Sequence, residues 1–105
     1  MKVLIIDGQG GRLGKYLCEQ ISGKYPNISL AAVGTNTAAT AAMIKGGAKK
    51  AATGENSVAV LSKSADVIIG PVGMVIADSL LGEITPKISL TVARSNAVKI
   101  MIPSD

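Results

Sequence analysis

The sequence predicts a single α/β domain over residues 1–105: a doubly wound parallel sheet of five strands, covered by helices to give three layers. Short apolar runs alternate with segments of helical periodicity along the whole chain, and the connections between them are short. The first run, KVLII, leads straight into the four glycines of IDGQGGRLGK, and a helical pattern follows. A strand that enters a helix through a glycine-rich turn is typical of nucleotide-binding folds, so we expect a Rossmann-like architecture.

Each predicted element rests on a residue pattern. Strands are expected at residues 2–6, 27–34, 49–54, 66–70 and 97–102. Helices are expected at residues 12–23, 35–48 and 55–65, with another from residue 85 onward. The first strand is β-branched, as in buried parallel sheets, and the first helix repeats Leu13, Leu17 and Ile21 on one face. In the second helix, Thr35 or Asn36 can cap the first turn.

The second half of the chain continues the alternation. The third strand is only weakly marked by its sequence. Val58 and Val60 lower the helix propensity of the third helix, so that helix is predicted from its place in the alternation. Residues 74–84, MVIADSLLGEI, are apolar on more than one face of any helix they form. Thr85-Pro86 then has N-cap and N1 chemistry in the right order. We favour the strand order 3-2-1-4-5, and element order alone leaves the flavodoxin-like order 2-1-3-4-5 open.

Composition limits the chemistry that this chain can perform. Hydrophobic residues make up 48% of the chain but aromatic residues only 2%, so the core is expected to consist of small aliphatic side chains. The absence of histidine removes the commonest general base and metal ligand, and no metal site is predicted. The single cysteine, Cys18, excludes an internal disulfide and fits a reducing compartment.

Charge and hydropathy indicate the location and the partners. The formal net charge is +4, but the basic residues are scattered and only Tyr16 and Tyr25 are aromatic. This pattern argues against nucleic-acid binding and favours a surface that attracts small anions. No signal peptide is evident, and the longest weakly polar run, residues 67–77, is shorter than the roughly 20 residues that a bilayer requires. We therefore expect a cytoplasmic protein with no membrane segment.

The candidate site lies at the strand exits, the residues that directly follow each predicted strand. In an open parallel sheet, ligands bind beyond the carboxyl ends of the strands, and every predicted exit here is marked by glycine or proline. The predicted ligand-binding residues are Asp7, Gly8, Gln9, Gly10, Gly11, Arg12, Thr35, Asn36, Thr53, Asn56, Gly70 and Gly73. The backbone amides of Gly8, Gly10 and Gly11 are expected to receive an anion, with Arg12 or Lys15 assisting.

The glycine pattern of the first exit, G-x-G-G-x-x-G, is one insertion away from the dinucleotide fingerprint. The alternative is that these glycines only make the turn and let the helix pack closely on the sheet. Two features argue against a standard NAD pose. The tip of the second strand, Gly34-Thr35-Asn36, has no carboxylate for ribose hydroxyls and no arginine for a 2′-phosphate, and there is no second domain for a substrate. The cofactor stays unidentified, with a nucleotide as one candidate.

Three carboxylates are expected to reach this crevice: Asp7, Glu55 and Asp78. Asp7 is the one candidate for acid–base catalysis, because an acid that ends a buried strand needs a partner. Its alternative role is to cap the turn. Glu55 is favoured as an acid in the first turn of a helix, and Asp78 as a solvated residue.

An interface is predicted at residues 74–84. Six large apolar side chains in this segment exceed what one helix face can bury against a sheet, which favours a homodimer. The alternative is a partly non-helical segment that fills one end of the core.

Five stretches together resemble one protein family; they are IDGQGG, GTNTAATAAMIKGGA, ATGEN, GPVGMVIADSLLGEITP and KIMIP. The sequence is similar to a family of short bacterial proteins, mostly from anaerobic Firmicutes, that is catalogued as a domain of unknown function. The resemblance covers nearly the whole chain and implies a stand-alone Rossmann-like protein, with no residue roles to carry over. The expected function is the binding of a small anion, such as a nucleotide or a phosphorylated metabolite. A non-catalytic, dimeric interaction module is the alternative.

Overall fold

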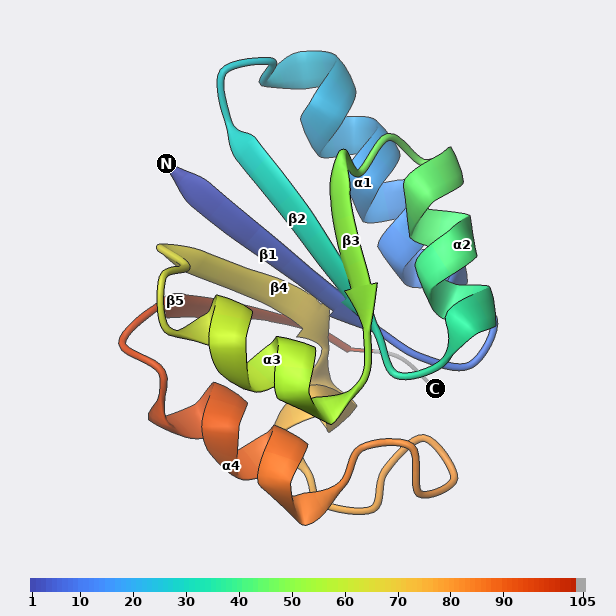
Figure 1. The fold of residues 1–105 in the computed structure, drawn as a ribbon, viewed down its shortest axis with the longest axis vertical. Coiled ribbons are helices and arrows are strands. Elements are labelled where there is room, and N and C mark those ends of the chain that lie inside the picture. Colours follow the sequence, from blue (N-terminus) through green and yellow to red (C-terminus); the bar gives the residue numbers. More distant parts are fainter. Residues whose placement is uncertain (104–105) are drawn as a thin grey trace.

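The chain folds around a five-stranded parallel sheet in the order β3-β2-β1-β4-β5, as seen in a computed structural model that describes residues 1–103 (Figure 1). The strands are β1 (Lys2–Asp7), β2 (Ser29–Gly34), β3 (Lys50–Thr53), β4 (Val67–Pro71) and β5 (Val98–Ile102). The helices are α1 (Arg12–Lys24), α2 (Thr37–Lys45), α3 (Glu55–Ser62) and α4 (Pro86–Arg94), together with a short 3₁₀ helix, η1 (Val72–Val75). The predicted α/β class and the favoured strand order are confirmed.

The helices form two layers, one on each face of the sheet. Helices α1 and α2 pack together on one face, and α3 and α4 pack together on the other (Figure 1). Strand β1 serves both cores because successive side chains of a strand point to opposite faces. Val3 and Ile5 join the core under α1 and α2, whereas Leu4 and Ile6 join the core under α3 and α4. The largest fully buried side chains are aliphatic or sulfur-containing, as the composition predicts.

The segment at residues 74–84 is mostly non-helical. After η1 the chain continues as the β4–α4 loop (residues 76–85), which consists of turns. Met74 and Ile84 are both fully buried, so the two ends of the segment are fixed in the core while its middle crosses the carboxyl edge of the sheet. The two ends of the segment therefore help to fill one end of the core, as the non-helical alternative expects, whereas Ile76 and Leu81 in its middle stay exposed.

Small differences in the boundaries of elements have local causes. Strand β2 begins at Ser29 and not at residue 27, because the N–H of Ile28 donates to the carbonyl of Tyr25 and closes a turn there. Helix α3 ends at Ser62, a few residues before its predicted end. No helix within residues 1–103 combines the length and the hydropathy needed to cross a membrane.

Candidate functional site

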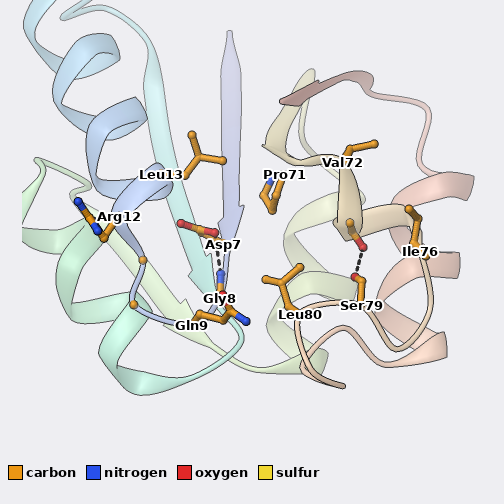
Figure 2. A pocket seen from close by; sticks show the side chains of 13 residues that line it. Asp7, Gly8, Gln9, Arg12, Leu13, Pro71, Val72, Ile76, Ser79 and Leu80 are labelled. Atoms are coloured by element: carbon orange, nitrogen blue, oxygen red, sulfur yellow. Dashed lines mark hydrogen bonds between the residues drawn. The ribbon is translucent and has the colours of Figure 1, made fainter. Parts of the chain in front are cut away.

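A cavity of about 440 Å³ opens at the carboxyl edge of the sheet, between β1 and β4 (Figure 2). Strand order reverses direction at this point, which is where ligands bind in doubly wound sheets. One wall is the glycine-rich turn and the start of α1, from Asp7 to Leu13. The other wall comes from residues 71–73 and from the β4–α4 loop, with Ile76, Ser79 and Leu80. The volume lies in the range of roughly 300–1,000 Å³ that is usual for small-molecule sites.

Asp7 organises the turn through backbone amides. Its side chain is only 5% exposed; one carboxylate oxygen accepts the N–H of Gly8 at 2.8 Å, and the other accepts the N–H of Gly14 at 2.6 Å (Figure 2 shows the Gly8 bond). Burial raises the pKa of the Asp7 carboxyl above its ordinary value, and the two amide bonds work against that rise. Because Gly14 is the third residue of α1 and Gly11 has no side chain to offer, Asp7 caps the helix. These contacts match the turn-capping alternative for Asp7.

Three glycines of the turn are required by close packing. A Cβ atom at Gly8 would lie 2.6 Å from Thr35 Oγ1, and one at Gly14 would lie 2.5 Å from Met43 Sδ. Gly11 has a φ of +72°, and its Cβ would lie 2.7 Å from the Ala39 Cα atom. A Cβ at Gly10, by contrast, meets nothing within 4 Å. The crowded glycines are thus spaced three apart, and Gly10 lies beside open space.

The backbone amides of the turn are only partly available to a ligand. The N–H of Gly8 donates to Asp7, and the N–H of Gly11 donates to the Gly8 carbonyl at 2.9 Å. The amides of Gly10, Arg12 and Leu13 donate to no protein atom within residues 1–103. The expected anion contacts at the Gly8 and Gly11 amides therefore need correction, because folding itself uses both groups. The Arg12 side chain is exposed and points away from the centre of the cavity (Figure 2).

Glu83, which is not among the residues predicted from the sequence, reaches the same turn. Its Oε1 atom accepts hydrogen bonds from the Gln9 N–H at 2.8 Å, the Thr35 hydroxyl at 2.6 Å and the Asn36 side-chain amide at 2.9 Å. The Thr35 hydroxyl bond, helped by the other two, holds the pKa of the Glu83 carboxyl below its ordinary value, although partial burial opposes this. The expectation that Asp7, Glu55 and Asp78 are the carboxylates near the crevice is therefore wrong in omitting Glu83.

The other predicted residues are divided between the turn and more distant positions. Thr35 and Asn36 lie at the tip of β2 beside the turn, and Gly73 lines the cavity. Gly70 is buried, and its Cβ would lie 2.5 Å from the Ile6 carbonyl oxygen, so it permits close packing of β4 on β1. Thr53 pairs with Thr40 at 2.7 Å, away from the turn.

Asn56 and two of the predicted carboxylates do not line the cavity either. Asn56 is exposed on the first turn of α3. The neighbouring Glu55 accepts a hydrogen bond from the Thr85 hydroxyl, and Asp78 is exposed with a φ of +67°. These placements agree with the helix-start role of Glu55 and the solvated role of Asp78.

Several lining residues are missing from the predicted set. Pro71 and Val72 lie in the marked exit of the fourth strand but were not chosen as ligand contacts, and Leu13, Ile76, Ser79 and Leu80 lie outside the exits. Most of them are apolar, and apolar residues in a chain of this composition are first assigned to the core. The few polar residues within the apolar segment 74–84 were the available signal for Ser79 and Glu83.

The sheet order, the glycine-rich turn and the cavity at the switch point define a Rossmann-like α/β domain. The family described as "Domain of unknown function (DUF3842)" matches residues 2–105, and the chain belongs to this family. The family resemblance predicted from the sequence is thereby confirmed. No curated protein and no solved structure matches the chain.

Proposed function

We propose that this domain binds a small ligand that contains an anionic group and an uncharged organic group, such as a nucleotide or a phosphorylated metabolite. The observation that carries the proposal is the set of three amides, of Gly10, Arg12 and Leu13, that donate to no atom of residues 1–103 and lie at the start of a 13-residue helix and at the edge of the cavity. Such amides and the positive end of the helix dipole together favour an anion. A cytoplasmic location fits the unpaired, buried thiol of Cys18.

The walls of the cavity indicate how the ligand is oriented. The Asp7 carboxylate already takes the Gly14 amide, so the anionic group belongs at the outer amides of Gly10, Arg12 and Leu13. Apolar side chains, including Pro71 and Leu80, line the rest of the cavity and suit an uncharged organic group attached to the anion.

The substitution Gly10→Val tests this proposal. Its side chain has space in the folded protein, so the variant is expected to fold while the added methyl groups exclude the ligand from the turn. Gly23→Val is the matched control, because a Cβ at Gly23 also meets nothing within 4 Å and Gly23 lies near the other end of α1. Native mass spectrometry of the fresh protein and calorimetry with a nucleotide and phosphometabolite panel provide the measurement. Equal binding by both variants and the wild type would refute the site.

We propose a homodimer through residues 74–84 as the second candidate function, that of an interaction module. Two large apolar side chains of this segment remain exposed, Ile76 at 52% and Leu81 at 96%. Their burial against a second copy would be favourable. Light scattering after size exclusion should then give a dimer mass that Leu81→Lys converts to a monomer mass. A monomer in the wild type would exclude this candidate.

A further inference from the structure

The fold brings a carboxylate to the tip of β2, where the local sequence has none. Glu83 lies 47 positions from Asn36 along the chain, yet it contacts Thr35 and Asn36 at that tip as well as the Gln9 amide in the turn. Asn36 is itself fixed in place, because its Oδ1 atom accepts the Ala39 N–H at 2.8 Å and its amide group also donates to the Gln9 carbonyl at 3.0 Å. The position of the Glu83 carboxylate is therefore determined by three neighbouring groups.

The two oxygens of this carboxylate differ in their surroundings. All three donors converge on Oε1, whereas Oε2 accepts no hydrogen bond from any atom of residues 1–103. An ionised carboxylate only accepts hydrogen bonds, so Oε2 can accept one from water or from a ligand. Glu83 is only partly buried, which leaves it open to a donor from outside the protein.

Charge decides which ligand group this position suits. A phosphate would meet the negative charge of Glu83 and also that of Asp7, whose pKa the charge of Glu83 helps to raise. A hydroxyl group brings a donor without a charge, and the vicinal hydroxyls of ribose bring two. In dinucleotide-binding folds, an acid at the end of the second strand binds these hydroxyls.

We propose that Glu83 is the ribose-binding carboxylate of this domain and that the ligand is a ribonucleotide whose phosphate lies at the start of α1. This inference rests on the proposed function. The turn connects the two positions, because a Cβ atom at Gly8 would lie only 2.8 Å from Glu83 Oε1 and Gly8 also lines the cavity. In this pose the phosphate lies between the ribose and the cavity beside β4. The cavity then holds any group that is attached to the phosphate on the side away from the ribose. Through Glu83, the β4–α4 loop thus supplies the acid that the end of the second strand lacks.

Calorimetric titration with matched nucleotides tests the assignment. The probes are ADP, GDP, CDP and UDP, their 2′-deoxy counterparts, and inorganic pyrophosphate. The wild type should bind at least one ribonucleotide about 10- to 100-fold more tightly than its 2′-deoxy form, as expected for one hydrogen bond to a charged group. Glu83→Gln keeps an acceptor for the three donors but loses the charge, so the ribose preference should fall severalfold or more while pyrophosphate affinity is retained.

The control is Asp78→Asn, which removes a negative charge from the same loop at an exposed position where asparagine tolerates the positive φ. It should keep the full ribose preference. If pyrophosphate binds but the wild type does not distinguish ribose from deoxyribose, the ribose assignment is overturned and the proposed function stands; this comparison requires no variant. If neither pyrophosphate nor any nucleotide binds, both the assignment and the proposed function are overturned.

Discussion

Two adjacent glycines of the turn should respond very differently to the same added methyl group. In Gly11→Ala, alanine must adopt a φ of +72°, which costs about 1–2 kcal/mol. Its Cβ would also lie 2.7 Å from the Cα atom and 2.9 Å from the carbonyl oxygen of Ala39. These are backbone atoms of α2, so α1 and α2 must separate, at a further cost of about 1–3 kcal/mol. We expect Gly11→Ala to lower the free energy of unfolding by about 2–5 kcal/mol.

Gly10→Ala should leave the stability unchanged or raise it by up to about 1 kcal/mol, because alanine restricts the unfolded chain more than glycine does. Its Cβ meets nothing within 4 Å, and its φ lies outside the left-handed region. Urea unfolding followed by circular dichroism measures both variants under identical conditions. A difference between the two variants of less than about 0.5 kcal/mol would refute the packing described for this turn, since surface substitutions alone produce changes of that size.

Three further predictions concern a thiol, a carboxylate and a helix cap. Burial raises the pKa of Cys18 to about 11, so iodoacetamide should react slowly with the native protein at mildly alkaline pH and much faster in urea; equal rates would contradict the burial. The lowered pKa of Glu83 means that its stabilising contribution is present above the ordinary value of 4.5 and is lost as the pH falls through the folded value. The destabilisation by Glu83→Gln, measured from urea midpoints across a pH series, should therefore shrink on acidification, and a constant difference would argue against the three bonds. Thr85 accepts the Ile88 N–H at 3.1 Å at the start of α4, so Thr85→Ala should cost about 1 kcal/mol in chemical unfolding, and an unchanged midpoint would exclude the cap.

The fold was predictable because its signals are local. The four-residue spacing from Leu13 to Ile21 identifies α1, and Thr85-Pro86 correctly identifies the N-cap and the first residue of α4. The β4–α4 loop was not predictable in detail. Leu80 and Leu81 have φ values of 54° and 56°, a conformation that leucine rarely adopts and that no local sequence pattern predicts.

The candidate site was predictable in its position but only partly in its residues. Parallel strands place their exits at one edge, so the turn after β1 and the tip of β2 were expected together. Asn36 does donate to the Gln9 carbonyl there, and Thr35 donates to the same Glu83 oxygen as the Gln9 amide. Glu83 lies 74 positions from Gln9 along the chain, and no local pattern encodes a contact of that kind. The hydrogen bonds that the Gly8 and Gly11 amides donate within the turn could not be predicted from the sequence either, because they depend on the detailed course of the turn.

Glu83, Ile84 and Thr85 are consecutive residues with three different attachments. Glu83 binds the turn after β1, Ile84 is fully buried in the core beneath α4, and Thr85 caps that helix. Release of the turn by local opening of this segment would disturb the core and the helix as well, which makes sub-global opening here nearly as costly as unfolding the domain. Hydrogen-exchange protection of the turn should therefore follow global stability, and any occupant of the site would protect amides far from it.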